Sequence, residues 1–329
     1  MRRIAPLLGT VAVLVSAPAA GAQAPTAPTA KPPATKPVSG KLSLAAPNLY
    51  RVDGRPVALD RQTWRIVANA SQYVADQTVT FTIARNGHLL KRAVANLRPG
   101  RRGAGTAFTS FRLAGPGRVR VAVVLSATTA QRALSARGRI DVIQPYAGFG
   151  SGGLRVRYLQ RRLRALGYAI HLSGTFDDQT ARAVIAFRKV NRMSRGGPAI
   201  GRIYRQLARG RGGFRPRYPG HGRHMEADLS RQVLALINAN GQPSAVYHIS
   251  SGKPSTPTVL GSFYVYSKTP GYNSLGMLDA NYFIDGYAVH GYHEVPTYAA
   301  SHGCIRAPIP DAGSIYDWVH FGTRIDVYD

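Results

Sequence analysis

The spacing of apolar residues changes twice along this 329-residue chain, and those changes constrain its fold more than any other feature. Residues 41–145 alternate apolar and polar positions, as in VTFTIAR at 79–85, which is typical of half-buried strands. Asn86-Gly87 follows this stretch and predicts a two-residue hairpin turn. About a hundred residues of short strands without a helical period predict an immunoglobulin-like β-sandwich. It holds no cluster of catalytic residue types, so we interpret it as a spacer.

The next segment, residues 150–209, has a helical period instead. Leu159 and Leu163 recur at helical spacing, and Gly167 ends that helix. Asp177 is suited to cap a second helix, because its carboxylate can accept from the free amides of the first turn. The segment predicts a small helical bundle.

The last segment, residues 224–329, returns to strands. Asn240-Gly241 and Asp285-Gly286 each lie between apolar runs and predict hairpins. PDAGSIYDWVHFG predicts one helix, and the terminal TRIDVYD predicts a closing strand. The whole chain is therefore expected to be multidomain and mainly β.

The N-terminus predicts export. Residues 1–22 combine a basic start, a short apolar run and an Ala-Gly-Ala cleavage site, which together indicate a secretory signal peptide. Residues 23–40 are rich in Pro, Thr and Ala and predict an extended linker, and residues 210–223 predict a second one. No later stretch is apolar enough to cross a bilayer. We expect a protein of the cell wall or extracytoplasmic space, with no stable membrane span after signal cleavage.

Charge is distributed unevenly around a formal total of +28. From residue 215 onward there are eight Lys and Arg against nine Asp and Glu, whereas 35 basic and six acidic residues precede it. Such an excess of positive charge often indicates nucleic-acid binding. Because export removes the chain from nucleic acid, we predict anionic cell-envelope polymers as the partner and no nucleic acid.

Cys304 is the only cysteine, so it cannot form an internal disulfide. A cysteine reacts as its thiolate, which needs a nearby base, and His290 is the candidate. Gly303 lets a substrate approach closely, and the amides around it could hold an oxyanion. A buried filler cysteine would have apolar neighbours, and a redox thiol would need a second cysteine. A zinc site from His290, His293, His302 and Cys304 stays open, although the spacing matches no common zinc signature. His221 and His224 are expected to be solvated linker residues.

Two stretches carry resemblances to known families. VRYLQRRLRALGY with GTFDDQTARAVIAFR resembles the three-helix peptidoglycan-binding module, and departs from it at Arg188, where Gln is usual. TPTVLGSFYV, YAVHGY, SHGCIR and GTRIDVYD resemble the L,D-transpeptidases with a YkuD-type catalytic domain. Only ten residues separate His290 from Ser301, which is similar to a shorter-loop branch of that family.

The second resemblance implies roles for individual residues. Cys304 would be the nucleophile, His290 the general base and acid, and the Gly291 carbonyl the group that orients His290. The remaining implied positions are Ser301, His302 and Gly303 as further catalytic residues, the last through its backbone, and Arg306 and Tyr292 as substrate-binding residues. Arg306 would bind a substrate carboxylate or form a structural ion pair. No metal or other cofactor is implied.

The resemblance also implies an activity. Cys304 would attack a stem tetrapeptide of peptidoglycan, release D-Ala, and pass the acyl group to a diamino-acid amine of a second stem, giving a 3–3 cross-link. The partners would be peptidoglycan stem peptides and glycan. Two alternatives remain: an L,D-carboxypeptidase with water as acceptor, and a non-catalytic wall-binding protein.

Overall fold

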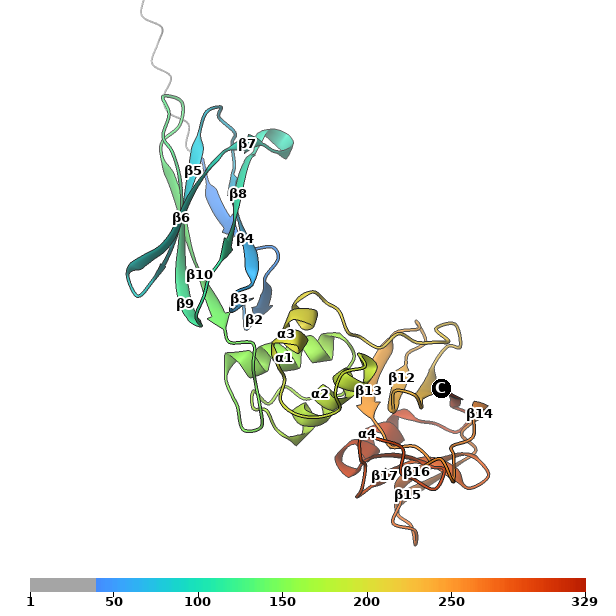
Figure 1. The fold of residues 1–329 in the computed structure, drawn as a ribbon. Coiled ribbons are helices and arrows are strands. Elements are labelled where there is room, and N and C mark those ends of the chain that lie inside the picture. Colours follow the sequence, from blue (N-terminus) through green and yellow to red (C-terminus); the bar gives the residue numbers. More distant parts are fainter. Residues whose placement is uncertain (1–39) are drawn as a thin grey trace, which may run out of the picture. The chain divides into compact units, whose positions relative to one another are not determined.

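The computed structural model describes residues 40–329 (Figure 1). The predicted signal peptide and residues 23–39 of the predicted linker lie outside the described residues. Within the described part, no helix is long and apolar enough to span a membrane. Strands dominate, as the sequence predicts, and helices gather in the middle of the chain.

The first part is a β-sandwich of the predicted kind. One sheet has the order β1-β4-β8-β7 and the other β2-β3-β10-β9-β5-β6. Alternate side chains of both sheets, among them Trp64, Phe81 and Val121, form one buried core. The predicted hairpin at Asn86-Gly87 is confirmed: both residues have positive φ, and they join β5 to β6. The strands are β1 (Leu42–Ala45), β2 (Tyr50–Val52), β3 (Arg55–Leu59), β4 (Thr63–Ala70), β5 (Thr78–Arg85), β6 (His88–Asn96), β7 (Arg98–Pro99), β8 (Gly105–Arg112), β9 (Gly117–Leu125) and β10 (Leu134–Ile143).

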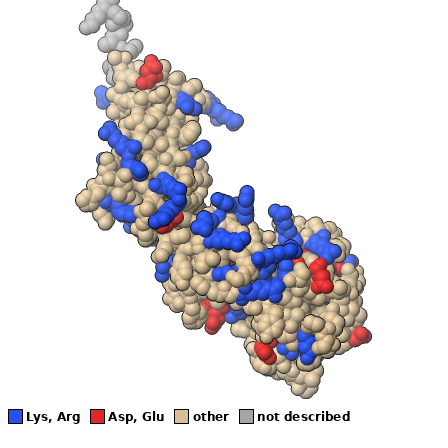
Figure 2. Space-filling model, viewed as in Figure 1, with Lys and Arg blue, Asp and Glu red and all other residues tan. Residues whose placement is uncertain are grey.

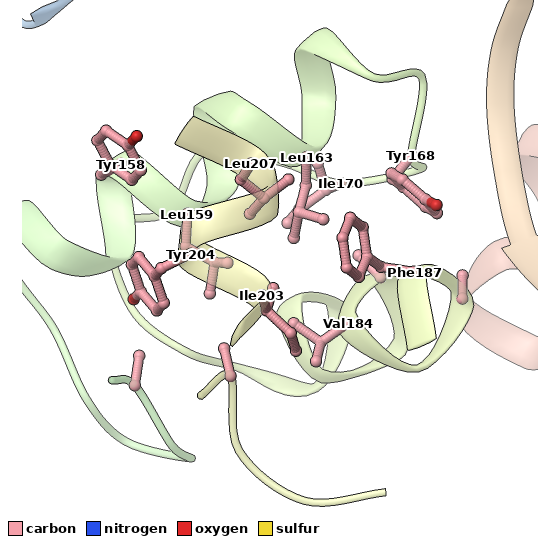
Figure 3. Close-up of a cluster of buried hydrophobic side chains, with 14 of the residues drawn as sticks. Tyr158, Leu159, Leu163, Tyr168, Ile170, Val184, Phe187, Ile203, Tyr204 and Leu207 are labelled. Atoms are coloured by element: carbon pink, nitrogen blue, oxygen red, sulfur yellow. The ribbon is translucent and has the colours of Figure 1, made fainter. Parts of the chain in front are cut away.

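The second part is a module of three helices, α1 (Leu154–Ala165), α2 (Asp178–Val190) and α3 (Gly201–Ala208). The predicted cap is present, because the Asp177 carboxylate accepts from the Thr180 amide at 2.8 Å. α1 ends at the predicted place, where Gly167 adopts a φ of 82°. The apolar faces meet in a common core that includes Leu163 and Phe187 (Figure 3).

The third part contains two sheets and one helix. The five-stranded sheet has the order β13-β12-β11-β19-β14, and the four-stranded sheet the order β15-β16-β17-β18. Both predicted hairpins are confirmed by the antiparallel pairs β12–β13 and β16–β17, and the predicted closing strand is β19. The elements are β11 (His224–Asp228), β12 (Val233–Ile237), β13 (Pro243–His248), β14 (Gly261–Tyr264), β15 (Ser267–Tyr272), β16 (Leu278–Ile284), β17 (Tyr287–Tyr292), β18 (Ile305–Pro308), α4 (Ile309–Trp318) and β19 (Arg324–Tyr328).

The five-stranded sheet buries both faces. One face packs in a core with β17, β18 and α4, through residues such as Met225 and Ile325. On the other face, Val233, Ala235 and Val246 belong to the same buried cluster as the helical module. The segment at 210–223 covers the same face at β11. Phe214 is buried, and the backbone amides of Arg217 and Tyr218 donate to the carboxylate of Glu226. The helical module and the third part therefore share a core.

Candidate active site

Strand pairing places the segments that carry Cys304 and His290 side by side in the four-stranded sheet. β17 and β18 run parallel, with Val289 opposite Ile305 and His290 opposite Arg306. Since Val289 and Ile305 face the core, the alternation of side chains turns His290 and Arg306 to the other face. Cys304 immediately precedes β18 and packs against Ala288, two residues before His290 on β17. Because side chains alternate along a strand, Ala288 and His290 lie on the same face of β17.

The imidazole of His290 is fixed in one tautomer. Its Nδ1 lies 2.9 Å from the carbonyl oxygen of Gly291. Because a carbonyl can only accept, Nδ1 carries the hydrogen and Nε2 keeps a free lone pair when the ring is neutral. Burial lowers the pKa of His290 to about 4, and the positive charge of Arg306 acts in the same direction. At neutral pH the ring is therefore an uncharged base.

Cys304 is half-buried directly before β18. Its Sγ lies 3.7 Å from the carbonyl of Gly286, and it packs against the small apolar cluster of Met277, Ala280 and Ala288. Burial raises the pKa of the thiol above its usual range, although a hydrogen bond from the Ala288 backbone and the charge of Arg306 oppose this. The resting pair is therefore a protonated thiol and a neutral imidazole, not an ion pair.

The loop before Cys304 is braced by Ser301. Its buried hydroxyl donates to the Cys304 carbonyl at 2.5 Å and accepts from the Gly303 amide at 3.1 Å. Gly303 has a φ of 122°, and a Cβ there would lie 2.2 Å from the Tyr287 ring. Only glycine fits this position, so the loop and the ring require it as much as substrate access does.

Arg306 and Tyr292 form an aromatic and cationic edge beside the base. The guanidinium lies 4.0 Å above the centre of the Tyr292 ring, and that ring meets His290 edge-on at 5.7 Å. His293 packs against Tyr292, with the ring centres 4.3 Å apart. Among residues 40–329, Arg306 forms no ion pair. No carboxylate among the described residues therefore neutralises the guanidinium of Arg306.

His302 occupies a different environment from His290. It is exposed, and its Nε2 lies 3.1 Å from Nζ of Lys253. The zinc alternative requires His302 to join Cys304, His290 and His293. Within residues 40–329, no three His, Cys, Asp or Glu side chains are arranged as metal ligands.

Thr258 is a site residue that sequence reasoning did not single out. Its buried hydroxyl donates to the Gly303 carbonyl at 2.7 Å and accepts from the Gly252 amide at 2.9 Å. It therefore braces the backbone next to Cys304 through the Gly303 carbonyl, in addition to Ser301. Its place in TPTVLG, within the transpeptidase resemblance, was the available signal.

The expectation that His221 and His224 are solvated was wrong for His224. This residue is fully buried at the start of β11, with Nε2 3.1 Å from the Glu226 carboxylate. His221 is partly exposed and bonds to Asp326 at 2.9 Å. The sequence suggested a Gly- and Arg-rich linker, but β11 pairs with β12 and β19 and so carries His224 into the sheet.

Comparison with known proteins agrees with this geometry. The L,D-transpeptidase catalytic domain family matches residues 222–327, and a peptidoglycan-binding domain family matches residues 152–196. A crystal structure of the L,D-transpeptidase from Xylanimonas cellulosilytica DSM 15894 is 33% identical, with a TM-score of 0.53. The match covers 56% of this chain and 98% of that one. This chain belongs to the L,D-transpeptidase family.

More distant L,D-transpeptidases also match. One from Stackebrandtia nassauensis is 19% identical over 56% of this chain and 95% of its own, with a TM-score of 0.34. One from Mycobacterium smegmatis is 12% identical over 89% of this chain and 100% of its own, with a TM-score of 0.28. No curated protein matches the chain.

Family membership indicates the class of enzyme and the class of its substrate. The transpeptidase family is a cysteine-dependent acyltransferase family, and the two matched domains indicate peptidoglycan as the substrate. Domains that act on the cell wall also indicate an extracytoplasmic location.

Proposed function

We propose that this transpeptidase-family member forms 3–3 cross-links in peptidoglycan, with Cys304 as nucleophile and His290 as base. One observation carries the proposal: Cys304 packs against Ala288, two residues before His290 on β17, and the bond from Nδ1 to Gly291 leaves Nε2 as a proton acceptor. A nucleophilic cysteine needs such a base, whereas a cysteine that only packs in a core does not.

Acylation begins from the neutral pair. As the sulfur attacks the carbonyl that precedes the terminal D-Ala of a stem tetrapeptide, Nε2 of His290 takes the thiol proton. The carbon–nitrogen bond then breaks, and His290 returns that proton to the leaving amine of D-Ala. A thioester between Cys304 and the remaining acyl group results. Because the imidazole is uncharged and the thiol protonated at rest, the proton moves during the attack rather than before it.

The oxyanion of the tetrahedral intermediate needs backbone donors. The amide of Gly303 already donates to Ser301, whereas the Cys304 amide has no acceptor in the part of the chain that is described. We assign the Cys304 amide as the first donor, and keep Gly303 as a second one if its bond to Ser301 is shared. Ser301 and Thr258 then act by holding this backbone in place.

Deacylation uses the same groups in reverse. The diamino-acid amine of a second stem attacks the thioester, and His290 accepts a proton from that amine. The carbon–sulfur bond then breaks, and His290 returns the proton to the sulfur of Cys304. Arg306, which has no ion-pair partner among the described residues, binds a stem carboxylate, and Tyr292 positions its guanidinium. His302 lies at the edge of this site, beside Lys253.

The other parts bring the enzyme to its polymer. We infer that the chain is exported by residues 1–22 and that the helical module binds peptidoglycan glycan. Figure 2 shows Lys and Arg side chains spread over the face in view, many of them on the sandwich and the helical module. This surface suits anionic cell-envelope polymers, whose attraction salt would screen.

Intact-protein mass spectrometry after incubation with a tetrapeptide muropeptide tests the proposal. The wild type should gain the mass of the acyl group and release D-Ala, and Cys304→Ala should do neither. Adding a second muropeptide should give a cross-linked dimer; release of free tripeptide instead would favour the carboxypeptidase. An adduct that survives in Cys304→Ala would contradict the nucleophile assignment.

A further inference from the structure

The helical module reaches into the third part of the chain through basic side chains whose role the peptidoglycan-binding assignment does not explain. Lys189, at the end of α2, is only 2% exposed. Its Nζ donates to the backbone carbonyls of Ile249 at 2.8 Å and Gln232 at 3.1 Å, and lies 3.4 Å from Nδ1 of His248. A buried amine is costly unless it is well bonded, so these acceptors fix the end of α2 against the backbone that flanks β12 and β13.

The backbone that Lys189 holds leads to the segment between β17 and β18 that contains Cys304, here called the Cys304 loop. The buried side chain of Gln232 accepts from the Ser251 amide at 2.9 Å and donates to its hydroxyl at 2.6 Å. The Ser251 carbonyl in turn accepts from the amides of Ala300 and Ser301, both at 2.9 Å. Ser301 is the residue whose hydroxyl bonds to the Cys304 carbonyl. An unbroken set of short hydrogen bonds and backbone therefore joins Lys189 to the nucleophile.

A second contact reaches the same loop more directly. Arg195, just beyond α2, donates to the Thr297 carbonyl at 2.7 Å and to the Ser230 carbonyl at 3.2 Å. Thr297 lies in the loop between β17 and β18, four residues before Ser301. Arg195 thus holds the middle of this loop, while Lys189 acts on the part nearer Cys304.

A third contact acts on the strand of the base. Arg182 of α2 forms a two-point ion pair with Asp311 of α4, at 2.9 and 3.1 Å. Asp311 is buried, and the adjacent Ala312 lies against Gly291, where a Cβ would come within 2.6 Å. Gly291 provides the carbonyl that orients His290.

We propose that α2 and the turn after it supply positioning residues of the transpeptidase, with Lys189 and Arg195 holding the Cys304 loop and Arg182 supporting the His290 strand. The helical module then completes the active site in addition to any role in wall binding. The inference rests on the proposed function only where turnover is measured, because the reactivity of Cys304 can be followed without substrate.

The test uses the full-length protein with Lys189→Met, Arg195→Ala and the conservative Arg195→Lys. Arg162→Ala is the matched control, because Arg162 donates to Leu207 inside the helical module and makes no contact with the Cys304 loop. We expect kcat to fall about 10- to 100-fold in Lys189→Met and Arg195→Ala, because small displacements of reacting groups cost rate. KM should stay within about twofold, since neither residue touches substrate. Arg195→Lys should recover part of the loss.

Iodoacetamide labelling of Cys304 supplies the readout that separates the two proposals. The labelling rate of Cys304 should differ from the wild-type value in Lys189→Met and Arg195→Ala, and equal it in Arg162→Ala. Wild-type protein without turnover, but with the same labelling pattern, would reject the proposed activity and keep the positioning role. If both variants keep kcat and labelling rate, and lose only melting temperature, the contacts are structural and the inference is wrong. If Lys189→Met does not fold, Arg195→Ala alone decides between these outcomes.

Discussion

Two buried histidines of the third part, His290 and His224, have pKa values shifted in opposite directions. His290 is 4% exposed and His224 fully buried, and each has one ring nitrogen bonded to a backbone carbonyl. For His290, burial and the charge of Arg306 lower the pKa to about 4. For His224, burial also opposes the charge, but the hydrogen bonds and the carboxylates of Glu226 and Asp326 outweigh it and raise the pKa. The charge of the neighbours, rather than burial, decides which histidine can serve as a base at neutral pH.

The largest effect is expected at the base. His290→Gln should slow formation of the acyl-enzyme by about 10²- to 10⁴-fold, because the variant keeps the shape but loses the proton acceptor. Single-turnover mass spectrometry with a tetrapeptide donor measures this rate. His293→Ala is the control, since His293 contacts Tyr292 and not the Gly291 carbonyl. An equal loss in His293→Ala, with His290→Gln unaffected, would move the base to the loop.

The second prediction concerns stability rather than rate. His224→Gln should lower the free energy of unfolding by about 3–5 kcal/mol, because it leaves the buried carboxylates of Glu226 and Asp326 short of a partner. Urea unfolding at pH 6 measures the change. The folded variant should still form the acyl-enzyme at the wild-type rate. A rate loss comparable to that of His290→Gln would erase the contrast between the two sites.

The two histidines should also give stability opposite pH dependences. The contribution of His290 is present above its unfolded pKa of about 6.5 and is lost as the pH falls toward 4, by up to about 3 kcal/mol. The contribution of His224, whose pKa is raised, is present below about 6.5 and is lost as the pH rises through its folded pKa. Glu226 and Asp326, whose pKa values are lowered, lose their contribution as the pH falls below about 4.

Unfolding of both Gln variants across pH 4–9 checks this assignment. His290→Gln should flatten the wild-type decline between pH 6.5 and 4, and His224→Gln should flatten the decline above pH 6.5. Parallel profiles for the two variants would mean that the neighbouring charges do not control the histidines as described.

The smallest expected effect is on the thiol. A thiolate paired with an imidazolium would label with iodoacetamide well below pH 8.5, which is what the lone cysteine beside a histidine first suggests. The raised pKa of Cys304 and the lowered pKa of His290 predict otherwise: labelling should increase only above about pH 8.5. The pH profile of labelling by mass spectrometry measures this, with His224→Gln as a control that should not shift it. Rapid labelling at pH 6 would indicate a preformed ion pair.

Local signals predicted most of the fold. The alternation in β5, the Asp177 cap, the Gly167 helix end and three hairpins follow from residues that are adjacent in sequence, and all are present. The resemblance also named Cys304, His290 and Gly291; in the structure the His290 ring bonds to the Gly291 carbonyl, and Cys304 packs against Ala288 of the same strand. Thr258 was missed because its bond to the Gly303 carbonyl spans 45 positions.

The sequence by itself determined the order of the three parts, their secondary structure and the residue types of the site, because short-range periodicity and turn chemistry act within a few residues. Only the tertiary structure decided that His224 is buried among carboxylates, that the pKa of His290 is lowered, and that Lys189 lies against the backbone leading to Cys304. Burial, pKa direction and bracing depend on which distant strands and helices become neighbours. That pairing arises from the whole packed core, in which the helical module and the five-stranded sheet share one buried cluster.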